Sequence, residues 1–123
     1  MRSGAPDLPI PSGVAISAPG PGVPAAHAAF LGQWGGFWGD ELPSILIVES
    51  VAADGRAQGY YLWGTGSQVP QPGTSRFDGQ IAGGALVWGD SVRFSFSVRE
   101  DGSLGGTRWA GSDTAFVRMI PMS

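Results

Sequence analysis

An alternation of apolar and polar side chains runs through residues 92–99, which read VRFSFSVR. Successive side chains of a β-strand point to opposite faces of the sheet, so this stretch predicts a strand with one apolar and one polar face. We expect the face with Phe94 and Phe96 to point inward. The face that contains Arg93 is then in contact with solvent.

Pairs of turn-forming residues separate this strand from others. Asp54-Gly55, Gly83-Gly84 and Asp101-Gly102 supply the positive φ angles that tight hairpins require. Together with the apolar runs between them, these turns predict strands near residues 32–38, 44–52, 57–64, 74–81, 84–89, 91–99, 103–110 and 113–120.

Short strands at a spacing of about 8–12 residues, joined by hairpins, are typical of an all-β sandwich or barrel. A meander of eight strands leaves two exposed edges unless it closes on itself, and closure removes both edges. We therefore expect an all-β, antiparallel up-and-down barrel of about eight short strands over residues 30–123. The interior of such a barrel is filled by side chains or holds one small ligand.

The first 29 residues differ in composition from the rest of the chain. They contain six prolines and no aromatic residue, whereas all thirteen aromatic residues lie between Phe30 and Phe116. Proline lacks a backbone N–H and fixes φ, so the segment 19–24 cannot join a helix or a sheet ladder. We predict an extended, Pro/Gly-rich arm over residues 1–29, in which residues 25–30 could form one helical turn.

Composition also excludes several kinds of chemistry. The chain has no cysteine, its seven basic residues are all arginine, and its one histidine is His27, so thiol and lysine nucleophiles and multi-histidine metal sites are excluded. We expect no cofactor and no metal. The net charge of −3 argues against a nucleic-acid partner, and no apolar run is long enough for a membrane-spanning helix. Prolines interrupt the N-terminal segment in which the apolar region of a signal peptide would lie. We therefore expect a cytoplasmic protein unless a leader was removed.

Five tryptophans in 123 residues are many for a small barrel. Those near predicted strand ends, Trp38, Trp63 and Trp109, either stack against a ligand or fill the core. Tyr61 shares a strand face with Trp63, and Arg93 could orient an anionic group if its face lined the interior. These five residues are our candidates for binding a small apolar or amphipathic molecule without catalysis.

Gly32-Gln33-Trp34 on the first predicted strand and Arg118 on the last resemble a pattern shared by the calycins, the group of lipocalins and avidins. The resemblance implies that Trp34 closes one end of the barrel and that Arg118 stacks across it in a cation–π contact. The short strands resemble an avidin-sized barrel. Residues 34–64 are also similar to poorly characterised bacterial barrel domains, and neither likeness implies an activity.

Two other functions are open at this stage. If the barrel were a reaction chamber for cyclisation or isomerisation, Glu49 and Tyr61 would be the catalytic candidates. Glu49 could equally form an ion pair at a strand end. Alternatively, the low content of charged residues and the proline-rich arm suit a structural domain that self-assembles, with the arm lying on a neighbouring copy in a homo-oligomer.

Overall fold

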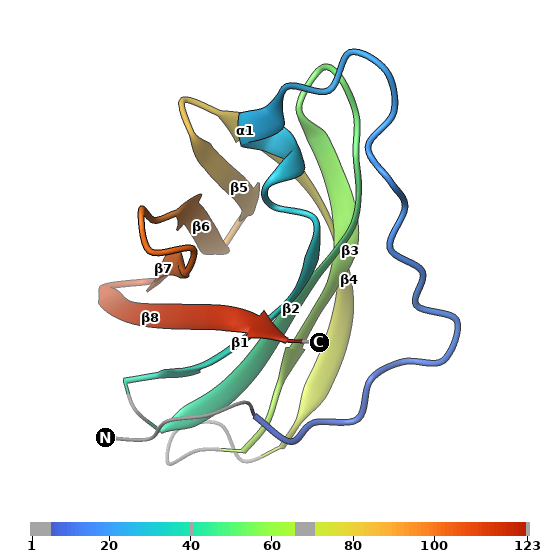
Figure 1. The fold of residues 1–123 in the computed structure, drawn as a ribbon. Coiled ribbons are helices and arrows are strands. Elements are labelled where there is room, and N and C mark those ends of the chain that lie inside the picture. Colours follow the sequence, from blue (N-terminus) through green and yellow to red (C-terminus); the bar gives the residue numbers. More distant parts are fainter. Residues whose placement is uncertain (1–5, 40, 66–70, 123) are drawn as a thin grey trace.

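The computed structural model describes residues 6–39, 41–65 and 71–122. Within these residues eight antiparallel strands form a closed barrel in which each strand pairs with its neighbours in the sequence (Figure 1). The strands are β1 (Gly32–Trp38), β2 (Leu42–Val51), β3 (Arg56–Trp63), β4 (Gly73–Ala82), β5 (Ala85–Gly89), β6 (Val92–Val98), β7 (Leu104–Ala110) and β8 (Asp113–Met122). The predicted up-and-down barrel is confirmed, and every strand begins and ends within two residues of its expected position.

Pairing between the first and last strands closes the barrel. Gln33, Trp34 and Gly35 of β1 lie opposite Met122, Pro121 and Ile120 of β8. This ladder satisfies backbone groups that an open sheet would leave at its two edges. The physical argument for closure from the sequence is therefore confirmed.

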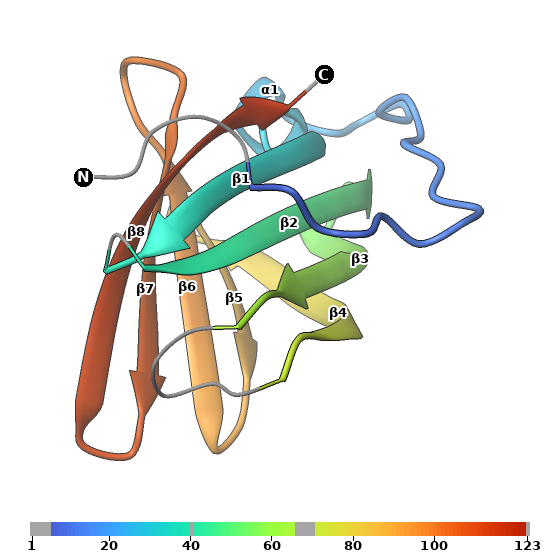
Figure 2. The ribbon, with the colours of Figure 1, turned by 90° about the horizontal axis from the view of Figure 1, so that it is seen from below.

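One end of the barrel is filled by the chain that enters it. The helix α1 (Ala25–Ala28) lies at the end where β1 begins (Figures 1 and 2), and it is the helical turn expected from the sequence. Phe30 follows it and is fully buried in the core. The indole Nε1–H of Trp34 donates to the carbonyl oxygen of Phe30 at 2.9 Å. We call this end the closed end.

An aromatic stack fills the middle of the barrel. The ring of Trp88 on β5 stacks on those of Phe77, Phe94 and Phe96, with centroids 4.5, 4.8 and 5.4 Å away. Gly106 lies opposite Phe96 in the β6–β7 register, and a Cβ at this position would collide with the phenyl ring. The glycine therefore provides the space that the aromatic stack requires.

The faces of β6 are those expected from its alternation. Phe96 is fully buried, and Phe94 packs against the core. Arg93 and Ser97, which flank this pair on the other face of the strand, are exposed to solvent.

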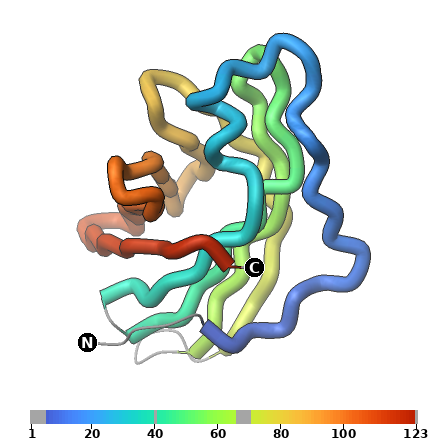
Figure 3. The backbone as a smooth tube through the Cα atoms, viewed as in Figure 1, coloured from blue at the N-terminus to red at the C-terminus, as the bar shows by residue number. Residues whose placement is uncertain are grey.

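The N-terminal arm packs against the outside of its own barrel. Residues 6–24 contain no helix or strand and run along the outer side of β2 and β3, a path that Figure 3 follows. Ser17 N–H donates to the carbonyl oxygen of Glu49 at 2.8 Å. Leu8 and Val14 pack against an outward-facing apolar cluster, which we call the outer cluster. It consists of Ile45, Ile47 and Leu62.

The arm explains why residues 45–48 are apolar on both faces. Leu46 and Val48 point into the barrel core, whereas Ile45 and Ile47 point outward and are still fully buried. Burial of each such side chain stabilises the fold by about 1.5–3 kcal/mol. The arm thus acts as a second layer over part of the barrel wall.

No helix in the described part of the chain combines the length and apolar character needed to cross a lipid bilayer.

Candidate functional site

A cavity of about 290 Å³ lies at the end of the barrel opposite α1. Its walls come from β2, β3, β4, β6 and β7, from positions near the ends of these strands that lie away from the closed end. We call it the mouth pocket. It is lined by Leu42, Tyr61, Trp63, Ser75, Val92, Phe94 and Arg108.

Strand alternation places these side chains in the pocket. On β3, Leu62 points outward beneath the arm, so its neighbours Tyr61 and Trp63 point inward. On β7, Arg108 follows an outward-facing threonine and precedes Trp109, which is 42% exposed. The position of a residue along its strand, and not its polarity, therefore decides whether its side chain points into the pocket.

A buried hydrogen-bond network holds the floor of the mouth pocket. The indole Nε1–H of Trp38 donates to the phenol oxygen of Tyr61 at 2.8 Å, and the hydroxyl of Ser44 lies 3.3 Å from the same oxygen. All three side chains are buried. Burial raises the pKa of Tyr61, against the opposing effects of these hydrogen bonds and of the positive charge of Arg108. The phenol is therefore a neutral group that can still donate one hydrogen bond at neutral pH.

Aromatic rings form one wall of the pocket. The rings of Tyr61 and Trp63 stack with centroids 5.8 Å apart, and Phe94 lies 4.7 Å from the Tyr61 ring. Gly73 lies opposite Trp63, and a Cβ there would collide with the indole. These contacts hold the wall in one conformation and present flat apolar surface to the cavity.

Arg108 brings a positive charge into this apolar surrounding. Its guanidinium carbon lies 5.9 Å from the ring centroid of Trp38, within the range of a cation–π contact. Its Nε is buried and has no hydrogen-bond partner among the described residues.

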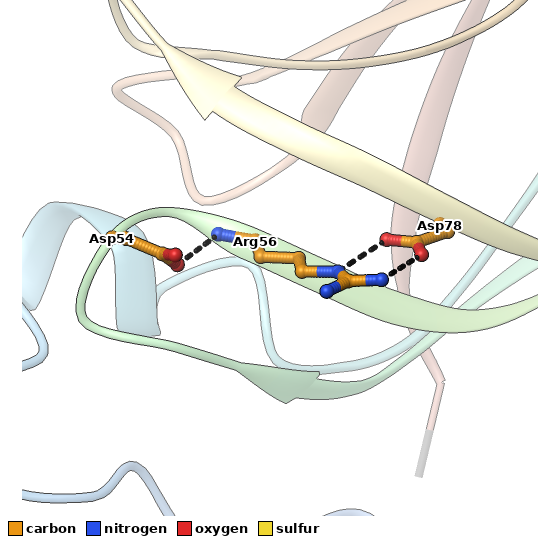
Figure 4. Close-up of polar contacts among 3 residues, drawn as sticks. All are labelled: Asp54, Arg56 and Asp78. Atoms are coloured by element: carbon orange, nitrogen blue, oxygen red, sulfur yellow. Dashed lines mark hydrogen bonds and ion pairs between the residues drawn. The ribbon is translucent and has the colours of Figure 1, made fainter.

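The ion-paired arginines lie outside the barrel. Within the described ranges, the ion pairs belong to Arg56, Arg76 and Arg118. Figure 4 shows the first of these, in which Nε and Nη2 of Arg56 donate to the two carboxylate oxygens of Asp78 across β3 and β4. Asp54 accepts the backbone N–H of Arg56 in the preceding turn. This arrangement is typical of a solvated strand pair and leaves Arg108 as the cation of the mouth pocket.

Three of the five predicted ligand-binding residues come together at the mouth pocket. Tyr61 and Trp63 line it, and Trp38 lies beneath, bonded to Tyr61. Arg93 and Trp109 do not line it; they lie opposite each other in the β6–β7 register on the outer face. Each is adjacent in the chain to an inward-facing residue, so the alternation of the strand turns it outward.

Glu49 lies on the outer face of β2, away from the mouth pocket. One carboxylate oxygen is 3.3 Å from Nη1 of Arg76, and the other accepts the backbone N–H of Ala15 at 3.1 Å. The ion-paired alternative is the one the structure shows. Its carboxylate therefore links the arm to the barrel wall and is not available as an acid or base in the pocket.

Trp34 and Arg118 lie on opposite faces of the barrel wall. Trp34 is buried at the closed end, whereas the side chain of Arg118 is 60% exposed and forms an ion pair with Asp101 at 3.0 Å. Val117 precedes Arg118 and points into the core, which turns the arginine outward. The stacking implied by the calycin resemblance is therefore replaced by an outer ion pair.

That outer ion pair belongs to a small network at the β6–β7 hairpin. Hydrogen bonds from the hydroxyl and backbone N–H of Ser103, and from Arg118, hold the pKa of Asp101 well below its usual range.

Comparison with protein-family models gives no match, and no curated protein is significantly similar to the chain. In the described residues, no group of three or more His, Asp or Glu side chains is placed to hold a metal ion.

Proposed function

We propose that the protein binds a small amphipathic molecule in the mouth pocket without covalent chemistry. The observation that carries this proposal is an apolar cavity whose lining includes two polar side chains, those of Tyr61 and Arg108. Concave apolar pockets with a few placed polar groups are the usual sites for small ligands.

The size of the cavity supports a small molecule. Its volume of about 290 Å³ lies near the lower end of the range of ligand pockets, about 300–1,000 Å³. One or two rings fit such a space, whereas a polymer or a long lipid chain does not. The flat wall formed by Trp63 and Phe94 favours an aromatic ligand.

The pocket is organised before any ligand enters. Tyr61 is held by its hydrogen bonds, and Phe94 is held by stacking on Trp88. Side chains that are already ordered lose little entropy on binding, which favours affinity.

The lining residues favour binding over catalysis. Among the described residues the lining includes neither a carboxylate nor an imidazole, so proton transfer by these residues would depend on Tyr61. The raised pKa of this phenol makes it a poor base at neutral pH.

We also propose a calycin-like kinship for the barrel. The support is the closed eight-strand topology with Trp34 at its closed end. Arg118 gives this kinship no support, because it lies on the outer face.

Titration with 2-naphthol, a neutral bicyclic amphiphile, tests the proposed function through tryptophan fluorescence. We expect saturable binding that Trp63→Ala weakens about tenfold or more, because the variant loses a ring of the pocket wall. Trp109→Ala is the matched control, since it removes an indole from the outer face. Equal weakening by both variants would contradict the proposal, as would an absence of saturable binding by 2-naphthol and by related one- and two-ring compounds.

A further inference from the structure

The charge of Arg108 has no anionic partner in the described residues. Its Nε–H is buried without an acceptor, although more than nine in ten buried donors in proteins have one. Burying a donor without a partner opposes folding. Unlike the ion-paired Arg56, Arg76 and Arg118, this arginine forms no ion pair with the described residues, so its charge is available to an anionic ligand that enters the pocket.

We propose that the ligand of the mouth pocket is a small aromatic carboxylate, whose carboxylate pairs with Arg108 while its ring system lies against the aromatic wall. This inference rests on the proposed function and specifies its ligand class. The planar guanidinium presents N–H donors in a fork that matches the two oxygens of a carboxylate. A single arginine offers one positive charge, so a monoanion is matched where a phosphate dianion would carry excess charge into an apolar site.

The neighbouring Tyr61 suits the same ligand group. Its oxygen already accepts the N–H of Trp38 at 2.8 Å, which leaves its own O–H as a donor. The Ser44 hydroxyl lies at 3.3 Å, near the outer limit for an O–H···O bond, and can rotate to accept or donate. The pocket thus offers donors to a carboxylate, and its described lining residues include no carboxylate that would repel it.

The aromatic wall favours a ligand that carries a ring system next to its carboxylate. Trp63, Tyr61 and Phe94 present ring surface on one side of the cavity, and Leu42 and Val92 complete an apolar lining. Stacking is available to a ring system but not to an aliphatic chain. A bicyclic carboxylate can pair with the charge of Arg108 and stack on the aromatic wall at the same time.

The test compares 2-naphthoate with 2-naphthamide, a neutral planar analogue of the same size. For the wild type we expect 2-naphthoate to bind about tenfold more tightly or better, since hydrogen bonds to charged groups contribute that much. In Arg108→Met the preference should disappear through loss of 2-naphthoate affinity, while 2-naphthamide binds within about threefold of the wild-type value. Arg93→Met is the matched control, because it removes the same charge from the outer face and should leave the preference intact.

Thermal unfolding of the ligand-free variants adds a second measurement. If Arg108 serves the ligand, Arg108→Met should be as stable as the wild type or more stable, because an apolar side chain replaces an unsatisfied donor. A clear loss of stability would indicate a structural role and overturn the inference. Arg108→Lys keeps the charge without the fork, and we expect it to retain only part of the preference.

The outcomes separate this inference from the proposed function. Equal affinity of the wild type for both compounds would overturn the carboxylate subsite and leave the pocket as a binding site. Equal loss of 2-naphthoate affinity in Arg93→Met and Arg108→Met would trace the preference to overall charge and also overturn it. Failure of both compounds and of 2-naphthol to bind would refute the proposed function itself.

Discussion

Trp38 and Tyr61 are joined by a hydrogen bond in which the indole Nε1–H donates to the phenol oxygen at 2.8 Å, although the two residues lie on strands that do not pair with each other. Strand alternation turns both side chains to the inside of the wall, where they meet across β2. The bond places a polar atom at the floor of an otherwise apolar pocket and fixes the ring that forms one side of it.

Tyr61→Phe should destabilise the fold. The variant leaves the buried N–H of Trp38 without an acceptor, and such a group costs about 1–3 kcal/mol. Urea unfolding measures the change in the free energy of unfolding. Tyr60→Phe is the control from the adjacent position, whose ring faces outward beneath Arg76, and it should change stability by less than about 0.5 kcal/mol. Equal effects of the two variants would refute a structural role for the buried bond.

The raised pKa of Tyr61 predicts a loss of stability at alkaline pH. Below the ordinary tyrosine pKa of about 10, Tyr61 is protonated in both the folded and the unfolded chain, and the contribution of its phenol to folding stability is fully present. Above that value the unfolded chain releases the proton first, so stability falls as the pH rises through the folded-state pKa. Absorbance titration near 295 nm should show Tyr61 ionising above the ordinary tyrosine value.

Tyr61→Phe should remove this late transition from the titration curve. If the absorbance lost in Tyr61→Phe belonged to a transition at or below pH 10, the burial of the phenol would be contradicted.

The arm should contribute to stability through the outer cluster. Leu8→Ser combined with Val14→Ser removes the apolar contacts to Ile45 and Ile47, and we expect the free energy of unfolding to fall by about 2–4 kcal/mol. The control is Ile10→Ser combined with Ile16→Ser, two arm residues whose side chains are exposed. If both double variants unfold at the same urea concentration, the arm does not stabilise the barrel wall.

Gly73→Ala should weaken ligand binding while the barrel stays folded. A methyl group at this position collides with the indole of Trp63 and pushes it out of the pocket wall. We expect 2-naphthol affinity to fall about tenfold, measured by fluorescence titration. Gly105→Ala is the control, because its Cβ would meet only the side chain of Arg99 at ordinary contact distance. An affinity unchanged in Gly73→Ala would show that the position of Trp63 does not matter.

The strands could be predicted because alternation and turn residues act locally. The pattern of residues 92–98 and the Asp-Gly and Gly-Gly turns determine the strand order, and closure follows from the cost of free edges. Residues 45–48 are apolar on both faces of their strand. What covers its outer face could not be foreseen, because the arm has no periodic pattern to match against it.

The site was predicted less completely, because the strand register, and not the type of a residue, decides which side chains line the pocket. Tyr61 and Trp63 were identified by their shared strand face. Arg108 was missed as a pocket residue because β7 reads LGGTRWA, in which apolar and polar residues do not alternate. The inward face of β6 gives the signal that could have found it, since Arg108 lies opposite Phe94 in the β6–β7 register.

Indole Nε1–H resonances offer the most direct test of binding in the mouth pocket, because the five tryptophans give five separate probes. A ¹H–¹⁵N correlation spectrum recorded during titration with 2-naphthoate should show saturable shifts at Trp63 and Trp38. The signals of Trp34 at the closed end and of Trp109 on the outer face should stay in place. Saturable shifts at Trp109 without shifts at Trp63, or no saturable shift at any indole, would contradict a ligand site at the open end of this barrel.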